Sequence, residues 1–202
     1  MADRPIALVT GAAQGIGYAC AEAIAADGAR VVLADINKAG VEAAAAKLGG
    51  DAVGMAVDMA DPAEILALFD RVERDVGPVA ILVNNAGIAK PANFLETTLE
   101  DFQAVINLNL TGVFVATQRA AQTMAAQNIK GAIVNMSSIN AQVAIPSIAA
   151  YCATKGGVMQ LTKAAAPAPA PHRVRVHAVW PGSIELAMQT RAHGDDDAKN
   201  TV

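Results

Sequence analysis

Short, unbroken apolar runs alternate with longer helix-forming stretches along the chain, and this alternation limits the fold more than any other feature. Strands that are apolar at every position, with no period of two, are typical of a parallel sheet covered on both faces. Helices between consecutive strands are the connections that such a sheet needs. The sequence therefore predicts an α/β fold: a doubly wound parallel sheet between two helical layers, in one domain spanning residues 1–202. Strands are expected over 6–9, 31–34, 52–57, 79–83, 131–136 and 174–180, and helices over 15–27, 37–48, 98–106, 111–127 and 149–166, with one more starting at Asp61 as N-cap and Pro62.

The composition excludes several classes of function. With a net charge of −4 and no long basic run, the chain lacks the clustered Lys and Arg that nucleic-acid binding needs. No apolar run reaches the roughly 18–20 residues that span a membrane, and the first five residues carry no signal-peptide core. Cys20 and Cys152 form no metal or redox motif and the three histidines are dispersed, so we expect no metal site and a cytoplasmic protein with reduced thiols.

The first expected strand ends in a glycine-rich turn, Thr10-Gly11-Ala12-Ala13-Gln14-Gly15-Ile16-Gly17. Glycine adopts positive φ and lets the backbone approach a ligand closely. The helix that follows directs free N–H groups and the positive end of its dipole at the turn, which suits a pyrophosphate. The alternative is a tight strand-to-helix turn that binds nothing.

An acidic residue, Asp35, ends the second expected strand. In a dinucleotide-binding unit a carboxylate at this position accepts hydrogen bonds from the adenosine ribose. The same charge repels a 2′-phosphate, and the turn contains no Lys or Arg, so the sequence favours NAD over NADP. Asp35 could instead be a helix cap.

Tyr151 and Lys155 lie four residues apart in an expected helix, and Ser138 precedes the tyrosine by thirteen residues. Positions i and i+4 share one helix face, so the ammonium is expected beside the phenol. A free tyrosine has a pKa of about 10, and a nearby positive charge lowers it toward the range useful for proton transfer. A serine hydroxyl beside the pair could hold a substrate oxygen.

These motifs occur in an order that resembles the short-chain dehydrogenase/reductase family, from about residue 5 to 184: Gly-x-x-x-Gly-x-Gly, Asn84-Asn85-Ala86-Gly87, Ser138, Tyr151 and Lys155. The resemblance implies a Rossmann-type fold, a nicotinamide cofactor, a small alcohol or ketone substrate, and a homodimer or homotetramer. By position it assigns cofactor contacts to Thr10, Gly11, Gln14, Gly15, Ile16, Gly17, Asp35, Asp58, Met59, Asn85, Ala86, Gly87, Tyr151, Lys155, Pro181, Gly182 and Ile184.

The resemblance also implies catalytic roles. Ser138 would bind the substrate oxygen, Tyr151 would act as general base or acid, and Lys155 would lower the tyrosine pKa and bind the nicotinamide ribose. Asn109 resembles the asparagine that holds a proton-relay water, although an asparagine can also simply bend a helix. Ser137 is expected to be structural.

Two segments depart from the family pattern. Pro167, Pro169 and Pro171 should end the helix that carries Tyr151 near Ala166. After Gly182 no candidate for the family's usual last strand and helix is present, so we expect an irregular tail over 185–202. Leu186 also stands where relatives commonly have a threonine that contacts the cofactor amide.

The leading hypothesis is an NAD(H)-dependent oxidoreductase that interconverts a secondary alcohol and its ketone. The main alternative is a nucleotide-binding or interaction protein of the same fold with weak catalysis. A sugar-nucleotide epimerase or dehydratase would use the same tyrosine and lysine, but the glycine spacing and the short chain disfavour it.

Overall fold

Six parallel strands form one sheet in the order β3-β2-β1-β4-β5-β6. The computed structural model describes residues 4–182. The expected doubly wound α/β fold is confirmed, and the strand order reverses between β1 and β4, where such sheets bind ligands beyond the carboxyl ends of the strands. The strands are β1 (Ile6–Thr10), β2 (Arg30–Asp35), β3 (Val53–Ala56), β4 (Val79–Asn84), β5 (Ala132–Met136) and β6 (Arg175–Val179).

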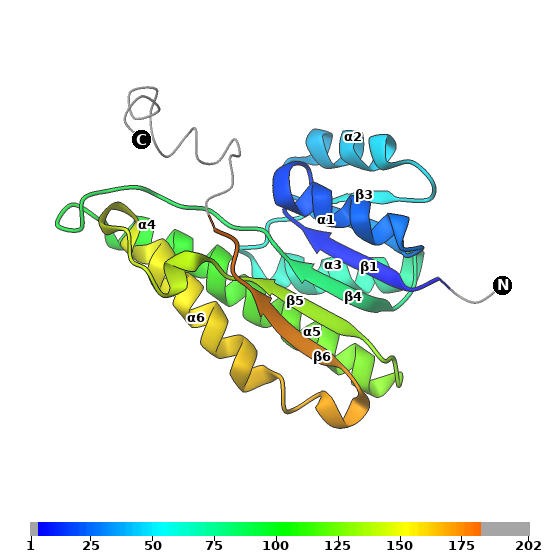
Figure 1. Cartoon of the computed structure of the whole chain (residues 1–202). Coiled ribbons are helices and arrows are strands. Elements are labelled where there is room, and N and C mark those ends of the chain that lie inside the picture. The colour runs from blue at the N-terminus through cyan, green and yellow to red at the C-terminus, as the bar shows by residue number, and fades with distance from the viewer. Residues whose placement is uncertain (1–3, 183–202) are drawn as a thin grey trace.

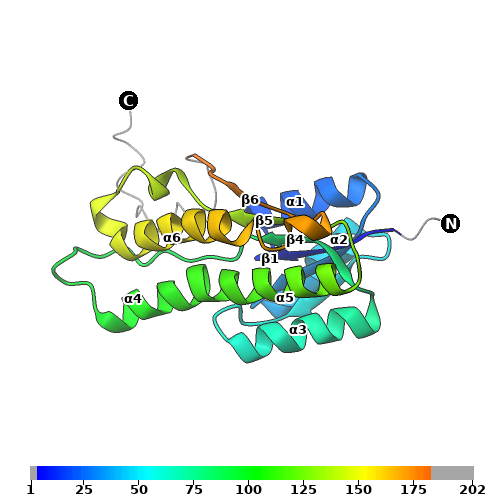
Figure 2. The ribbon, with the colours of Figure 1, turned by 90° about the horizontal axis from the view of Figure 1, so that it is seen from below.

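Helices cover both faces of this sheet (Figures 1 and 2). The helices α1 and α2 pack on one face, and α3, α5 and α6 pack on the other. Asp61 caps α3, with Pro62 in its first turn, as the sequence predicts. The bounds are α1 (Gly15–Ala26), α2 (Lys38–Leu48), α3 (Pro62–Asp75), α4 (Leu99–Ile106), α5 (Val113–Ala126) and α6 (Ala149–Ala165).

Two apolar cores lie on the two faces of β1. Ala7 and Val9 pack toward α1 and α2, whereas Ile6 and Leu8 pack into the core beneath α3 and α5. Every residue of β1 is buried. The uninterrupted apolar pattern of this strand therefore reflects burial on both sides.

A π-helical segment, Asn107–Gly112, joins α4 to α5. The helices predicted over 98–106 and 111–127 correspond to α4 and α5, and the residues between them form this π turn instead of an open break. A Cβ atom on Gly112 would collide with the carbonyl oxygen of Met59, so the small residue lets this segment lie against the turn after β3. The wider π turn places Asn109 in the interior.

The helix α6 ends at Ala165 with Ala166 as its C-cap, as predicted from the prolines that follow. The chain then forms a 3-10 turn, Ala170–His172, and Arg173 adopts a φ of +61° before β6 begins. The prolines therefore end the helix well after Tyr151 and Lys155, and both of these residues lie within α6.

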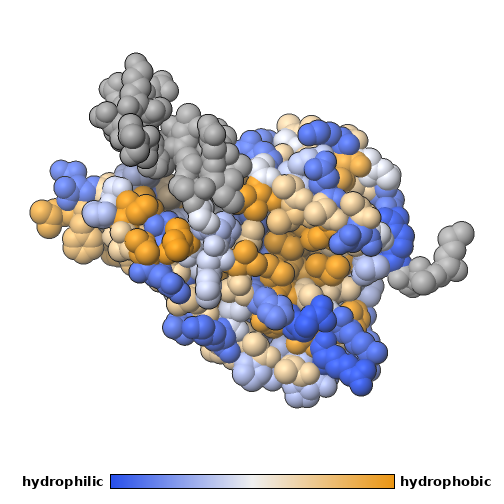
Figure 3. Space-filling model, viewed as in Figure 1, coloured by the Kyte–Doolittle hydropathy of each residue, from blue (hydrophilic) through white to orange (hydrophobic). Residues whose placement is uncertain are grey.

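The strand β6 differs on its two faces. Val176 is buried beneath the helices, whereas Arg175, His177 and Val179 are exposed on the face that α1 and α2 cover elsewhere. Figure 3 shows hydrophobic surface over the strands in the middle of this face. The predicted tail (185–202), Ile184 and Leu186 lie outside the described residues.

Within residues 4–182, no helix is long and apolar enough to cross a membrane. The same residues contain no group of three or more His, Cys, Asp or Glu side chains placed to hold a metal ion.

Candidate active site

The glycine turn forms a tight cradle at the start of α1. Gly11 and Gly15 adopt φ values of +63° and +61°, which favour glycine. A Cβ atom on Gly17 would collide with the Gly11 carbonyl and approach the Asn85 amide nitrogen to 2.6 Å. Gln14 supplies no side-chain cap, so the first N–H groups of α1 remain available to an anion. The cradle fits a dinucleotide pyrophosphate.

Asn85 and Thr10 fasten this turn to the end of β4. The Asn85 amide nitrogen donates to the carbonyl oxygens of Thr10 and Gly11, each at 3.0 Å. In return, the Thr10 hydroxyl oxygen accepts from the backbone N–H groups of Asn85 (3.0 Å) and Ala86 (3.1 Å). These four bonds fix the cradle at the switch point of the sheet, so Asn85 and Thr10 shape the backbone of the cradle.

Asp35 lies at the rim of the same turn. Its two carboxylate oxygens accept from the backbone N–H groups of Ala13 (3.1 Å) and Asn37 (3.0 Å). Asn37, not Asp35, caps α2, since its side chain accepts from Gly40 N–H. The helix-cap interpretation of Asp35 is therefore wrong, and its carboxylate places negative charge beside the glycine turn.

Asp58 and Met59 follow β3. The Asp58 carboxylate accepts from the Ala60 N–H at 2.8 Å, so it stabilises its own turn. The Met59 side chain is buried in the apolar core. A cofactor contact from Met59 would therefore come from its backbone.

Lys155 is buried in α6, and its ammonium nitrogen donates to the Met136 carbonyl at 2.6 Å. The nitrogen lies 5.4 Å from the centroid of the Tyr151 ring. Burial lowers the pKa of Lys155 to about 8, because desolvation penalises the charged form.

The pKa of Tyr151 is raised, which corrects the expectation that Lys155 lowers it. Burial of the phenol is the largest cause, the hydrogen bond with Ser138 acts in the opposite direction, and the neighbouring Cys152 raises the pKa slightly further. The Lys155 ammonium is directed at Met136 instead of the phenol oxygen. In this structure the Tyr151 phenol therefore keeps its proton at neutral pH.

The two adjacent serines have different surroundings. The Ser137 hydroxyl donates to the Lys155 carbonyl at 2.7 Å, which is the structural role expected of it. Ser138 is 7% exposed and begins the 3-10 turn Ile139–Ala141. Of the two, Ser138 is the one that lies beside Tyr151.

Asn109 is fully buried within the π-helical segment, so it does occupy a bend between helices. Its carboxamide oxygen accepts from Ile88 N–H (2.9 Å), and its nitrogen donates to the Ile88 carbonyl (2.8 Å) and the Thr154 hydroxyl (3.3 Å). The side chain is thus occupied in holding the segment after β4 against α6. Thr154, which also donates to the Tyr151 carbonyl at 2.8 Å, was not predicted from the sequence.

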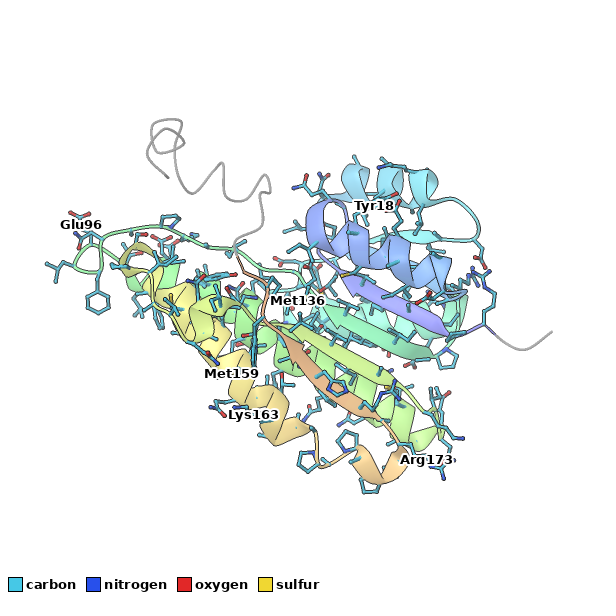
Figure 4. The ribbon with its side chains drawn as sticks, in the orientation of Figure 1. Tyr18, Glu96, Met136, Met159, Lys163 and Arg173 are labelled. Atoms are coloured by element: carbon cyan, nitrogen blue, oxygen red, sulfur yellow. The ribbon has the colours of Figure 1, made fainter. Side chains whose placement is uncertain are left out.

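Gly87 connects the glycine turn to the reactive groups. A Cβ atom built on Gly87 would lie 3.3 Å from the Asn109 carboxamide oxygen and 3.7 Å from the Lys155 nitrogen. Because Gly87 follows Asn85 closely in the chain, the cradle and the lysine adjoin at the carboxyl ends of β4 and β5. Met136 marks this point in Figure 4, and Glu96 marks the outer end of the long loop after β4.

The segment after β6 completes the edge of this site. The Pro181 carbonyl accepts from Ile139 N–H at 3.1 Å, so this segment lies beside Ser138. Gly182 is exposed at the end of the described chain. The structure therefore brings the glycine turn, Gly87, Asn109 and Lys155 together, and Ile184 lies outside the described residues.

A model of the short chain dehydrogenase family matches residues 5–197. The chain belongs to the short-chain dehydrogenase/reductase family. This is a family of oxidoreductases with a nucleotide-binding Rossmann fold.

Three similar proteins illustrate the range of this family. The D-threitol dehydrogenase of Mycolicibacterium smegmatis is 43% identical over 94% of this chain and 74% of its own length. The NADP-dependent (R)-specific alcohol dehydrogenase of Lentilactobacillus kefiri is 38% identical over 98% of this chain and 81% of its own. The crystal structure of 3-ketoacyl-(acyl-carrier-protein) reductase from Brucella melitensis complexed with NADH has a TM-score of 0.87 and 36% identity, covering 92% of this chain and 78% of that one.

A buried polar cluster beneath the site was also not predicted. The Asn84 amide nitrogen donates to Asn135 (2.8 Å) and Thr117 (3.1 Å), and the Asn135 nitrogen donates to Thr162 on α6 (3.0 Å). Asparagine within an otherwise apolar strand is the signal that could have revealed it, because a buried amide needs partners. The cluster ties α5 and α6 to neighbouring strands.

Proposed function

We propose that the protein is an NAD(H)-dependent oxidoreductase that interconverts an uncharged secondary alcohol and its ketone. The observation that carries this proposal is the proximity of Lys155 and Asn109 to Gly87, because Lys155 shares α6 with Tyr151 and Gly87 follows the residue that fastens the glycine cradle. A nucleotide-binding protein without catalysis has no need for a buried lysine at this point, since burial of its charge is costly.

The cofactor preference is argued from Asp35. Its carboxylate retains lone pairs after accepting from Ala13 and Asn37, so it can also accept from two ribose hydroxyls. A 2′-phosphate at the same place would bring two negative charges together. NAD is therefore the favoured cofactor, although the relative from Lentilactobacillus kefiri is NADP-dependent.

The reactive residues would share the work as follows. Bound nicotinamide supplies hydride chemistry, and Lys155, Gly87 and the turn hold that cofactor in place. Ser138 positions the substrate oxygen beside Tyr151. In reduction, the phenol of Tyr151 gives its proton to that oxygen, which suits its raised pKa. In oxidation, the phenol of Tyr151 must first lose its proton before it can accept one from the alcohol, so oxidation should become faster at alkaline pH.

In this scheme the side chain of Asn109 has a structural role. Since its side chain is bonded to Ile88 and Thr154, a relay water near Lys155 would have to be held by backbone carbonyls of the π-helical segment.

The test is turnover of alcohols and ketones followed by NADH absorbance. We expect D-threitol, related polyols and simple secondary alcohols to be the first substrates to screen, each with NAD and with NADP. Turnover that is faster with NAD supports the proposal. Tight NADH binding with no turnover across the panel would favour the alternative of a weakly catalytic nucleotide-binding protein.

We also propose that two copies associate through the outward faces of α5 and α6. A groove of about 450 Å³ lies there, with Phe114, Leu161 and Pro169 among the residues that line it. Sedimentation analysis of the intact chain and of a Phe114→Lys variant tests this proposal, because a charge at the centre of an apolar interface should favour the monomer.

A further inference from the structure

The Ser138 hydroxyl has only one proton to donate, and Asn140 accepts it. The Ser138 oxygen lies 3.1 Å from the Asn140 carboxamide oxygen and also accepts from the Asn140 backbone N–H at 3.1 Å. A serine hydroxyl offers one donor and two acceptor sites. One donor and one acceptor are therefore engaged by Asn140, and the remaining lone pair is the one that can accept from the neutral phenol of Tyr151.

The direction of the proton follows from the third contact of Asn140. Its carboxamide nitrogen donates to the Val143 carbonyl at 3.1 Å. A backbone carbonyl can only accept, so the nitrogen must face Val143 and the oxygen must face Ser138. Because that oxygen is also only an acceptor, the proton between the two residues belongs to Ser138.

We propose that Asn140 is a positioning residue that holds the Ser138 proton away from the substrate oxygen and so favours binding of the alcohol over the ketone. This inference rests on the proposed function. An alcohol can donate its own O–H to the remaining lone pair of Ser138, in place of the Tyr151 phenol. A ketone has no proton, so it binds Ser138 well only after the Ser138 hydroxyl rotates and gives up its bond to Asn140.

The ionised form of Tyr151 competes for the same proton. A phenolate accepts a hydrogen bond from Ser138 more strongly than a neutral carboxamide oxygen does. The other groups that act on the phenol are the Lys155 ammonium, 5.4 Å from the ring centroid on α6, and the thiol of Cys152. Neither of them touches Asn140 in the hydrogen-bond network, so a neutral substitution at Asn140 should reach Tyr151 through Ser138, whereas a carboxylate at that position also acts on the phenol through its charge.

Two variants separate this role from simple support of the loop. Asn140→Ala removes the acceptor for the Ser138 proton and the donor to Val143. Asn140→Asp also removes the donor to Val143, but it keeps an acceptor and makes it negative. Both variants therefore lose the bond to Val143, and they differ in the group that faces Ser138.

We expect opposite effects on substrate binding. In Asn140→Ala the KM of the ketone should fall about 3- to 10-fold relative to that of the alcohol, as expected from release of one neutral hydrogen bond. In Asn140→Asp the ketone should bind more weakly than in the unaltered protein. Shifts of the ketone-to-alcohol KM ratio in the same direction in both variants, or no shift in either, would overturn the proposal.

A spectroscopic titration keeps this test independent of turnover. Tyrosinate absorbance is followed against pH in each protein and in the same protein carrying Tyr151→Phe. Subtracting the second curve from the first removes the contribution of Tyr18. The pKa of Tyr151 should fall by about half a unit to one unit in Asn140→Ala and rise in Asn140→Asp. If these opposite shifts occur while no substrate is turned over, the proposed function fails and the role of Asn140 stands. If the shifts are absent or of one sign, the role of Asn140 fails whatever the turnover.

Discussion

The two halves of the sheet are held in place by different forces. Around β1 and β2 the strands are buried on both faces, and apolar packing together with backbone turns shapes the glycine cradle. At β6, among residues 4–182, only one face is covered, and alternate residues of the strand are exposed. The nucleotide half is thus a packed scaffold, whereas the reactive half depends on something other than two-sided packing.

Hydrogen bonds to α6 from the end of β5 and from the residue after it supply that support. Three successive residues of the chain bind α6: the Asn135 amide to Thr162, the Met136 carbonyl to the Lys155 ammonium, and the Ser137 hydroxyl to the Lys155 carbonyl. Each of these bonds is buried, so each is costly to break. The comparison of the two halves indicates that these three buried hydrogen bonds hold α6, and with it Tyr151 and Lys155, against the sheet.

The largest expected effect is a loss of turnover without a loss of NADH binding or stability. Tyr151→Phe should lower turnover by about 10²- to 10⁴-fold, because the proton donor is lost. NADH affinity and the melting temperature should change little, since no described hydrogen bond from the phenol reaches the nucleotide half. Turnover comparable with the unaltered protein would remove Tyr151 from the mechanism.

The next effect concerns the pH dependence of the reactive half. The pKa of Lys155 is about 8 in the folded protein and 10.5 ordinarily. Between these values the unfolded chain binds more protons, so the free energy of unfolding should rise with pH, by up to about 3 kcal/mol. Below pH 8 both forms are protonated and the full cost of the buried charge is present.

Urea unfolding of the apoprotein at pH about 8 and about 10 checks this sign. Lys155→Met should abolish most of the rise, although it also removes the partner of the Met136 carbonyl and therefore changes the absolute stability. The raised pKa of Tyr151 acts in the opposite direction only above its ordinary value of 10.0. An equal rise in the variant would mean that another group is responsible.

A smaller effect is expected in the nucleotide half. Gly17→Ala places a methyl group against the Gly11 carbonyl and the Asn85 amide, and should cost about 1–3 kcal/mol of stability and weaken NADH binding. Gly156→Ala on α6 is the matched control, because its Cβ would meet only the Ala141 carbonyl at 3.8 Å. The control should be neutral or stabilising by about 0.5–1 kcal/mol. Calorimetry and NADH titration compare the two.

The same contrast explains what the sequence could predict. Apolar strands, the glycine spacing and the Asp61-Pro62 helix start depend on local rules, and the structure bears them out. The π-helical segment, by contrast, follows from Asn109 bonding to Ile88, a residue far away in the chain. The raised pKa of Tyr151 depends on burial and on where the Lys155 ammonium points, and neither can be read from i, i+4 spacing.

The smallest effects compare the two faces of β6. Val176 is 7% exposed and packs in the core, whereas Val179 is 45% exposed on the uncovered face. Val176→Ala should therefore cost about 2 kcal/mol, from lost burial and the cavity left behind. Val179→Ala should cost about 0.5 kcal/mol or less. Denaturant midpoints at equal slope give the comparison directly, and similar losses at both positions would show that the outer face of β6 is covered in solution, so that the two halves of the sheet differ less than the described residues indicate.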